Sequence, residues 1–387
     1  MSHAALLIPT LDRLGGAERQ VMLLARGLSG RGWRASVVAL SGTGGAAAQE
    51  LSDRGIAFFS LGMRKGLADP RGWIRFHRWL REAKPNVVHA HLPHSAWLAR
   101  WSRLAAPVPV FLDTLHSSST GGCGRRLGYR FSRWLPHHVT AVSRAVADSH
   151  LCARMVNPAA LSIVPNGVET AEWKPDAAAR AAVRRELGVG NEFLWIAAGR
   201  LEPVKDFSTL VAAMALLPES TQLLIAGDGP LRNKLVRQTE SSGLSGRVRF
   251  LGFAPKLLRW MQAADALVLS SLWEGLPMVL LEAAACALPA VGTDVPGVRE
   301  VIEPGADGFL VPPRDPSTLA KVMHRLMQLP LAERLRMGQR ARLHAIARFD
   351  IKTVLDRWED LYGSFLPEQR DQADSSSLRS DAASGRF

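Results

Sequence analysis

Two glutamates that are eight positions apart could bind the hydroxyl groups of a ligand beside the start of a helix. The segment SLWEGLPMVLLEAAACALP places Glu274 in a predicted loop and Glu282 about two turns into a predicted helix. Pro277 suits a first helical turn, where no N–H is needed, so the helix is predicted to begin there. The free N–H groups and the positive dipole of a helix start attract a diphosphate. The segment therefore suits a nucleotide-sugar site, although a structural ion pair of Glu282 with an arginine stays open.

Two cations follow a predicted strand in AAGRLEPVKDF. Arg200 offers a planar fork of donors and Lys205 a point charge, and such groups can clamp a diphosphate. Solvated surface cations are the alternative. No Asp-x-Asp triplet occurs in the chain, so we expect no carboxylate-bound divalent metal. Charge neutralisation then falls to Arg200, Lys205 and the helix start at Pro277.

Glycines follow two other predicted strands. Gly15 and Gly16 come after the first strand, and Gly227-Asp228-Gly229 follows a strand in the second half. Without a Cβ, either loop lets the backbone approach a ligand, and either could equally be a simple turn. Neither has the spacing of a dinucleotide-binding motif or of a phosphate loop ending in Gly-Lys-Ser/Thr, which argues against nicotinamide and ATP chemistry.

Two histidines also end predicted strands. They are His91 in VVHAHLPHS and His116 in FLDTLHSSS. An imidazole at such a position can hydrogen-bond a sugar hydroxyl or polarise a reacting group at neutral pH. Most histidines do neither, so the pattern alone leaves both roles open.

Short apolar runs recur along the chain and would position these residues. They end in polar or glycine-rich loops and alternate with predicted helices such as 72–83 and 95–104. This alternation predicts parallel sheets, whose ligands gather at the carboxyl ends of the strands. The first series is AALLIP, ASVVAL, IAFFSL, NVVHAH, PVFLDTLH, HVTAVS and LSIVPNG, and the second is FLWIAAGR, TQLLIAGDG, RVRFLG, ALVLSS, PAVGTD and GFLVP.

The length of 387 residues favours two domains over one core. We predict an N-terminal domain over 1–170, a linker over 171–190 and a C-terminal domain over 191–345. A helix over 346–366 returns to the first domain, and a tail over 367–387 is predicted to be disordered. Three widely spaced cysteines fit a reducing cytosol, and we identify no signal peptide or membrane span.

Taken in order, nine motifs resemble the retaining glycosyltransferases of the GT-B, family 4 type. They are GGAERQ, VVHAHLPHSAW, TLHSS, AVSRAV, IVPNGVE, AGRLEPVKDF, IAGDGP, VRFLG and WEGLPMVLLEAAACALPAV. The resemblance implies an α/β fold of two Rossmann-like parallel-sheet domains facing across a cleft, with the nucleotide sugar held mostly by the C-terminal one. It implies transfer of a hexose or N-acetylhexosamine from a UDP- or GDP-linked donor with retention of configuration, without a cofactor or a required metal.

The resemblance also implies roles for individual residues. The family's paired glutamates correspond to Glu274, near the donor sugar, and Glu282, on the ribose. Its phosphate-binding cations correspond to Arg200 and Lys205, and its donor-sugar histidine to His116. The other donor-binding positions are Gly15, Gly16, Gly229, Gly275, Leu276 and Pro277.

One departure concerns the residues after the first glutamate. Many family members have Gly-Phe-Gly or Ser-Phe-Gly there, whereas here Gly275 is followed by Leu276 and Pro277, so we expect a slightly different sugar pocket. The resemblance also implies no obvious carboxylate nucleophile on the reacting face. We therefore favour front-face attack, in which the leaving diphosphate oxygen takes the acceptor's proton while Arg200, Lys205 and the helix dipole stabilise its charge.

The excess positive charge lies in the first half of the chain. Residues 1–170 carry 21 Lys and Arg against 9 Asp and Glu, whereas 171–387 carry 27 against 26. A local basic field indicates a phosphate-rich partner. PRGWIRFHRWLREAK and GRRLGYRFSRWLP mix arginines with aromatic residues, as in surfaces that rest in anionic headgroups, although helices that pack their aromatics inward are the alternative. The residues predicted to face the acceptor and the membrane are Arg71, Arg75, Arg78, Arg125, Arg126 and Arg130.

We therefore expect a lipid-linked sugar acceptor and a cytoplasmic protein bound peripherally to the inner face of the membrane. A nucleic-acid-binding protein is the rival from another class, but no binding motif for it is found, so no nucleic-acid partner is expected. A nucleotide-sugar epimerase of the same fold and a degenerate family member that only binds the sugar nucleotide are further alternatives.

Overall fold

The computed structural model describes residues 1–64, 69–106, 108–119 and 121–366. The chain forms two compact units. Unit 1 comprises Met1–Val142, Val146–Pro165 and the chain from Lys352 onward, and unit 2 comprises Ser143–Ala145 and Asn166–Ile351.

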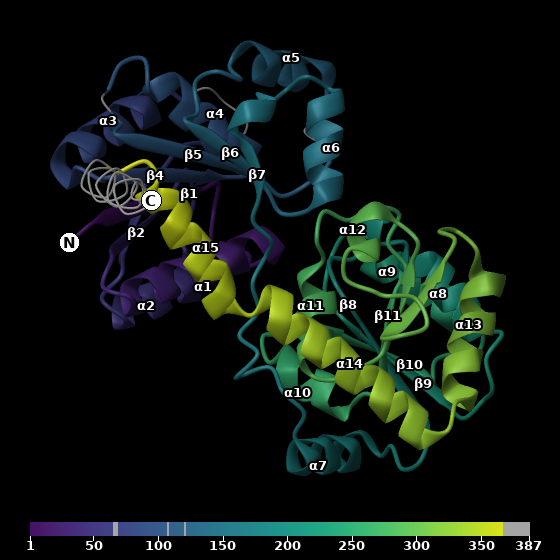
Figure 1. The fold of residues 1–387 in the computed structure, drawn as a ribbon. Helices are drawn as coiled ribbons and strands as arrows, with labels where there is room; N and C mark the ends of the chain where they lie inside the picture. Colours follow the sequence, from purple (N-terminus) through teal and green to yellow (C-terminus); the bar gives the residue numbers. More distant parts are fainter. Residues whose placement is uncertain (65–68, 107, 120, 367–387) are drawn as a thin grey trace, which may run out of the picture. The chain divides into compact units, whose positions relative to one another are not determined.

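Unit 1 is built on a seven-stranded parallel sheet. Its strands are β1 (His3–Ile8), β2 (Arg34–Ala39), β3 (Ala57–Ser60), β4 (Val87–His91), β5 (Val110–Leu115), β6 (His138–Ala141) and β7 (Leu161–Ile163). They lie in the order β3-β2-β1-β4-β5-β6-β7 (Figure 1). The central strands are continuous apolar runs because helices bury both faces of the sheet.

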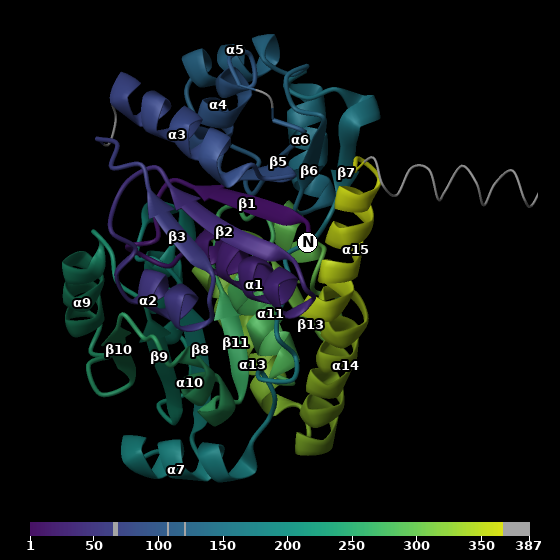
Figure 2. The same cartoon turned by 90° about the vertical axis from the view of Figure 1, so that its left-hand side faces the viewer.

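Helices cover both faces of the unit 1 sheet (Figure 2). One face carries α1 (Gly16–Gly30) and α2 (Gly45–Asp53), and the other carries α3 (Pro70–Ala83) and α4 (Pro93–Ser102). The remaining helices of this part of the chain are α5 (Cys123–Phe131), α6 (Arg144–Cys152) and α15 (Ile351–Gly363). Helix α15 is held by buried Trp358 and Tyr362 and by Arg31, which donates to Asp356 at 2.6 Å.

Unit 2 is built on a six-stranded parallel sheet. Its strands are β8 (Phe193–Ala198), β9 (Thr221–Ala226), β10 (Val248–Gly252), β11 (Ala266–Leu269), β12 (Ala290–Thr293) and β13 (Gly308–Val311). Their order is β10-β9-β8-β11-β12-β13. All the strand segments predicted from the sequence form strands, which confirms the two parallel α/β sheets.

The unit 2 sheet is also covered on both faces (Figure 1). One face packs on α8 (Phe207–Met214), α9 (Arg232–Ser241) and α13 (Pro316–Gln328), and the other on α10 (Leu257–Ala263), α11 (Met278–Ala285) and α14 (Leu331–Phe349). Trp195, Leu210 and Met323 are fully buried members of the core on the α8 and α13 side. The short helix α12 (Pro296–Arg299) follows β12.

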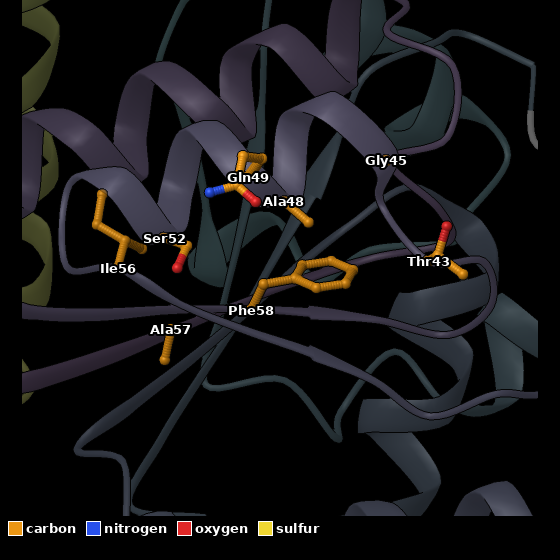
Figure 3. A pocket seen from close by; sticks show the side chains of 8 residues that line it. All are labelled: Thr43, Gly45, Ala48, Gln49, Ser52, Ile56, Ala57 and Phe58. Carbon is orange, nitrogen blue, oxygen red and sulfur yellow. The ribbon is translucent and has the colours of Figure 1, made fainter.

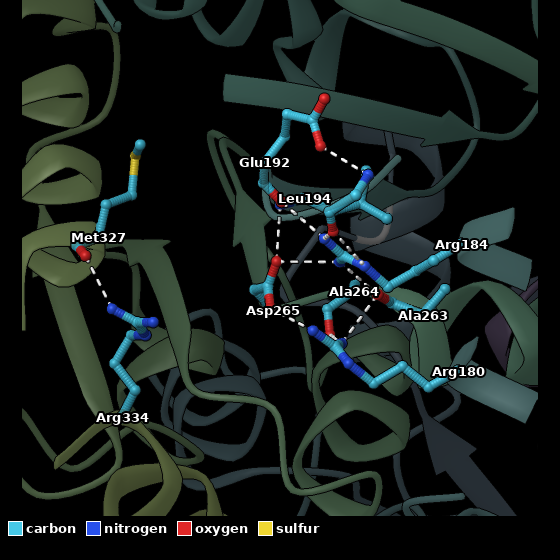
Figure 4. Close-up of polar contacts among 10 residues, drawn as sticks. Arg180, Arg184, Glu192, Leu194, Ala263, Ala264, Asp265, Met327 and Arg334 are labelled. Carbon is cyan, nitrogen blue, oxygen red and sulfur yellow. Dashed lines mark hydrogen bonds and ion pairs between the residues drawn. The ribbon is translucent and has the colours of Figure 1, made fainter. Parts of the chain in front are cut away.

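Helix α7 (Ala177–Leu187) is held against the rest of unit 2 by two arginines that share one carboxylate (Figure 4). Asp265 accepts from Arg180 at 2.5 Å and from Arg184 at 3.2 Å. Both arginines also donate to the carbonyl of Ala263, the last residue of α10, at 2.8 and 3.1 Å. The two guanidinium groups together therefore neutralise the Asp265 carboxylate and provide hydrogen bonds to a carbonyl at the C-terminal end of α10.

This docked helix lies inside residues 171–190, which the sequence predicted to be a linker. Asp176 caps α7 by accepting from the N–H of Ala179 at 2.9 Å, and Gly188 ends it in the left-handed conformation with φ 66°. These are ordinary helix start and stop signals. The predicted disordered tail over 367–387 lies outside the described residues.

Candidate functional site

Each sheet reverses its strand order at one point, and ligands of open parallel sheets bind beside such a switch point. In unit 1 the switch lies between β1 and β4, and in unit 2 it lies between β8 and β11. The segment after β8 contains Lys205, and the segment after β11 contains Glu274. The sequence-predicted cation and acid of unit 2 therefore follow two neighbouring strands.

Lys205 and Glu274 form an ion pair in unit 2. Lys205 Nζ lies 2.5 Å from Glu274 Oε1, and the two side chains are 22% and 10% exposed. Ser271 Oγ donates to the same carboxylate oxygen at 2.6 Å. Because partial burial reduces screening by water, this pair is stronger than a surface pair. The sequence predicted both residues but not their contact.

Buried hydroxyl groups fix the two segments that carry this pair. Ser270 Oγ donates to the carbonyl of Lys205 at 2.8 Å, and Thr293 Oγ1 donates to the carbonyl of Ser271 at 2.5 Å. The N–H of Leu272 donates to the carbonyl of Val204 at 2.8 Å. Sequence reasoning missed these serine and threonine residues. The available signal was the position of Ser271 three residues before Glu274 in the same quoted motif.

Arg200 lies apart from the Lys205–Glu274 pair. Its side chain is 61% exposed, and its guanidinium lies 2.7 Å from the carboxylate of Glu202. An exposed pair of this kind contributes about 0–1 kcal/mol, so the arginine can change partners at little cost. The structure therefore gives Arg200 a surface position in the same segment as Lys205.

The glycines after β8 and β9 allow two loops to touch. A Cβ on Gly227 would lie 1.9 Å from the carbonyl oxygen of Gly199, and a Cβ on Gly229 would lie 2.6 Å from that of Leu201. The N–H of Leu201 donates to the carbonyl of Asp228 at 3.0 Å. Contact between loops within the protein thus accounts for the glycine at 229 without a ligand.

Helix α11 begins at Met278, one residue later than predicted, and Pro277 is its extended N-cap. Leu276 before it is buried, and its carbonyl accepts from the side-chain amide of Asn166 at 3.0 Å. A Cβ on Gly297 would lie 2.4 Å from the carbonyl oxygen of Gly275. The turn that leads into α11 is therefore held from two sides, and sequence reasoning did not identify Asn166.

Glu282 is an internal residue of α11, as predicted, and is 3% exposed. Burial together with the charge of Glu282 raises the pKa of the Cys286 thiol to about 12. Cys286 is the C-cap residue that follows α11, so it lies within the electrostatic influence of this carboxylate. The structure places Glu282 and Glu274 at opposite ends of one short segment, the first inside the helix and the second before it.

In unit 1, strand pairing brings two histidines together. His91 ends β4 and pairs in register with Thr114 of β5, and His116 follows β5 directly. His91 Nδ1 lies 3.0 Å from His116 Nε2. His91 is buried and His116 is half-buried. Of the two imidazoles whose roles the sequence left open, His116 is therefore the more accessible to a ligand.

Gly15 and Gly16 lie at the start of α1. The N–H of Gly15 donates to the Glu18 carboxylate at 3.0 Å, and a Cβ on Gly15 would lie 2.7 Å from that oxygen. The glycine thus leaves room for the acid that closes the first turn.

Helix α5 divides its apolar residues between the interior and the surface. Tyr129 is buried, with the guanidinium carbon of Arg100 4.2 Å from its ring centre. Leu127, Phe131 and the following Trp134 are 54%, 66% and 65% exposed. The arginines among them, Arg125, Arg126 and Arg130, are exposed.

Helix α3 carries three of the arginines that we predicted to face the acceptor and the membrane. Arg71 and Arg78 are exposed beside Ile74, which is 61% exposed. Arg75 is half-buried instead, because its guanidinium turns to the carbonyl of Gly62 at 3.4 Å and towards Asp69. No helix among the described residues is long and apolar enough to cross a bilayer.

A pocket of about 430 Å³ lies elsewhere in unit 1, between α2 and β3 (Figure 3). None of the predicted site residues lines it. Its lining residues are Thr43, Gly45, Ala48, Gln49, Ser52, Ile56, Ala57 and Phe58. The described residues also contain no group of three or more His, Cys, Asp or Glu arranged to hold a metal ion.

Two family models match the chain. Residues 180–344 match the model described as Glycosyl transferases group 1, and residues 14–172 match Glycosyltransferase Family 4. Glycogen synthase of Mycobacterium tuberculosis is 30% identical over 329 residues, which are 80% of this chain and 73% of that protein. UDP-Gal:alpha-D-GlcNAc-diphosphoundecaprenol alpha-1,3-galactosyltransferase of Escherichia coli is 26% identical over 81% of this chain and 84% of its own length.

Solved structures show the same fold. The Anabaena protein HepE in complex with UDP-glucose superposes with a TM-score of 0.84 at 23% identity, covering 94% of this chain and 100% of that one. Sucrose-phosphate synthase from Thermosynechococcus elongatus gives a TM-score of 0.81 at 21% identity, covering 94% and 98%. At these identities the likeness establishes the fold.

Proposed function

This chain belongs to the group 1, family 4 glycosyltransferases of the GT-B fold, and on that premise we propose that it transfers a hexose or N-acetylhexosamine from a UDP- or GDP-linked donor to a sugar acceptor. The observation that carries the proposal is the Lys205–Glu274 pair beside the switch point between β8 and β11. At this place one ligand could contact both the Lys205 ammonium group and the Glu274 carboxylate, which is a hydrogen-bond acceptor. A diphosphate and the hydroxyls of its sugar need those two groups.

Donor binding would exchange the partner of Lys205. A diphosphate carries more charge than Glu274, so it competes for the ammonium group while Arg200 leaves its weak surface pair to join it. Glu274 then keeps the hydroxyl of Ser271 and accepts hydrogen bonds from the donor sugar. The dipole at the start of α11 adds to the stabilisation of the diphosphate.

Further contacts complete the proposed donor site. Buried Glu282 would accept from the ribose hydroxyls, and the turn of Gly275, Leu276 and Pro277 would bring backbone N–H groups to the diphosphate. The Gly15–Gly16 turn and His116 are proposed to contact the donor sugar. The segment containing Gly229 would support these contacts from the neighbouring loop.

We further propose that transfer proceeds with retention by front-face attack. The bond from the sugar to the leaving diphosphate breaks as the acceptor oxygen attacks the same carbon from the same face. The diphosphate oxygen takes the acceptor's proton, and Lys205 and Arg200 stabilise its developing charge. No metal is required in this scheme, so activity should persist in the presence of EDTA.

The acceptor is proposed to be a lipid-linked sugar reached at the inner face of the cytoplasmic membrane. Exposed Leu127, Phe131 and Trp134 beside arginines give a surface that suits anionic headgroups. The Escherichia coli relative acts, by its name, on a diphosphoundecaprenol-linked sugar.

Liposome flotation tests the membrane step. We expect the protein to float with anionic vesicles at low salt and to be released by high salt. Leu127→Ser together with Phe131→Ser should weaken binding, whereas Leu331→Ser, at a position of unit 2 that is 63% exposed, should not. A protein that stays unbound at low salt would remove the membrane surface from the proposal.

Thermal-shift screening of UDP- and GDP-sugars tests the donor, because a ligand of the native state stabilises it by mass action. The donor that raises the melting temperature is then incubated with a lipid-linked sugar, and the anomeric configuration of the product is determined by NMR. An inverted product would overturn retention. Epimerisation of the donor in the absence of any acceptor would overturn the transferase assignment.

A further inference from the structure

His91 is a buried residue that touches His116 and has one nitrogen without a partner. His91 Nδ1 lies 3.0 Å from His116 Nε2, whereas His91 Nε2 is buried and forms no hydrogen bond with any described residue. Burial lowers the pKa of His91 well below its ordinary value and that of His116 to about 4. Both rings are therefore neutral at pH 7, and each carries one proton.

One of these two protons lies in the hydrogen bond between His91 Nδ1 and His116 Nε2. The other proton then sits on His91 Nε2 or on His116 Nδ1. If His91 carries it, a buried N–H group points to no acceptor, an arrangement that is rare in folded proteins. If His116 carries it, the N–H group lies on a half-buried ring that water or a ligand can reach.

No neighbouring imidazole relieves His91 Nε2. The ring of His89 lies 4.0 Å from that of His91, centre to centre, but both of its nitrogens are already engaged. His89 Nδ1 lies 2.7 Å from the hydroxyl of Tyr362, and its Nε2 lies 2.5 Å from Oγ1 of Thr114.

We propose that His91 is a positioning residue that donates its Nδ1 proton to His116 Nε2 and so fixes the Nδ1–H tautomer of His116. His116 then presents one group to a ligand, a hydrogen-bond donor. Its partner must be an oxygen acceptor, which in the proposed function is a hydroxyl or phosphate oxygen of the donor substrate. The neutral His116 cannot take the acceptor's proton at Nδ1, so that proton goes to the leaving diphosphate.

The tautomer is measurable without turnover. The full-length protein is labelled with ¹⁵N-histidine, and the signals of His116 are identified by their loss in His116→Gln. We expect the ¹⁵N shifts at pH 7 to show His116 protonated on Nδ1 and bare on Nε2, and His91 to show the same pattern. Protonation of His116 on Nε2 would overturn the proposal.

Two variants of His91 separate positioning from packing. His91→Asn keeps an amide that can donate near the place of Nδ1, whereas His91→Leu removes the donor and keeps an apolar side chain of similar bulk. We expect His116 to stay protonated on Nδ1 in the Asn variant and to populate both tautomers in the Leu variant. Equal tautomer populations in both variants would contradict the role of His91.

Kinetics with the donor identified by thermal shift gives the second readout. We expect kcat/KM to fall about tenfold in His91→Leu, the effect of misplacing one donor, and to recover most of this loss in His91→Asn. Because the NMR arm needs no substrate, a wrong tautomer overturns the positioning inference alone. A correct tautomer in a protein that transfers no sugar overturns the proposed function alone.

Discussion

The two units share a strand order but place different chemistry at their switch points. In unit 2 a cation and an acid meet in partly exposed loops, and hydroxyl groups fix both. In unit 1 two neutral imidazoles meet, one of them fully inside the protein. The shared topology determines where on each sheet a ligand can bind. The side chains that follow each strand determine whether the ligand contacts charged groups or neutral hydrogen-bond donors.

The largest difference between the units should appear when the charges of unit 2 are removed. We expect Lys205→Ala and Glu274→Ala each to reduce turnover by about a hundredfold or more, because each loses a preorganised electrostatic contact. His91→Leu in unit 1 is expected to cost far less. Steady-state kinetics with donor and acceptor measures both.

The double variant of Lys205 and Glu274 tests whether the two residues act together. Because the side chains touch, its loss should be smaller than the product of the single losses. Arg340→Ala, which removes an exposed cation on α14, is the control and should keep normal turnover. Near-normal rates in both single variants would show that the donor binds elsewhere.

Acid should destabilise unit 1 before unit 2. Nine of the eleven histidines lie in unit 1, and burial lowers the pKa of each. Such a histidine is neutral when folded and gains a proton on unfolding, so its contribution is complete above pH 6.5. It is lost as the pH falls towards the folded pKa, which is about 4 for His116.

Between pH 7 and pH 5, His116 alone should lower the unfolding free energy of unit 1 by about 2 kcal/mol, and the other buried histidines should add to this loss. Hydrogen exchange, corrected for the intrinsic pH dependence, resolves the two units. His89→Gln should reduce the acid response, and His324→Gln, at an exposed position of unit 2, should leave it unchanged. Equal loss of protection in the two units would contradict this account.

Removing one supporting hydroxyl in unit 2 should have a moderate effect. We expect Ser271→Ala to lower kcat about tenfold, because Glu274 loses a hydrogen bond of 2.6 Å but keeps its place in the loop. Ser241→Ala removes an exposed hydroxyl on α9 and is the matched control. An unchanged kcat in Ser271→Ala would show that Lys205 alone orients the carboxylate.

The smallest expected effect is that of pH on kcat/KM through protonation of His116. Burial keeps the pKa of His116 at about 4, so its neutral form persists from pH 8 down to about pH 5. The rate kcat/KM should therefore change less than about threefold over that range through this residue. An inflection near pH 6.5 that disappears in His116→Gln would show that the ring titrates during turnover.

Most of the fold could be predicted from the sequence because buried parallel strands are continuous apolar runs that end at glycine or polar loops. The segments FLWIAAGR and NVVHAH illustrate this, since each is a strand whose carboxyl end carries a candidate site residue. Contacts between residues distant in sequence could not be predicted in this way. Lys205 and Glu274 were each identified by motif, but only the neighbouring positions of β8 and β11 bring them together.

Burial was the other property that local patterns could not supply. His91 and His116 stand at similar places in similar motifs, yet one is inside and the other is half-buried. Tyr129 and Phe131 differ likewise, because Arg100 covers one ring and solvent surrounds the other. Within residues 171–190, which we predicted to be a linker from their alanine and charge, Asp176 and Gly188 delimit a helix that composition alone did not indicate.

The attachment of α7 sets where unit 2 can be cut from the chain. A fragment that starts at Asn191 would keep Asp265 but lose Arg180 and Arg184. Of the partners of this carboxylate drawn in Figure 4, only the N–H of Leu194, at 2.8 Å, would then remain. The surface of α10 beneath α7 would be uncovered at the same time. A fragment spanning Asn166 to Ile351 retains both guanidinium groups and is therefore the better choice for ligand titration.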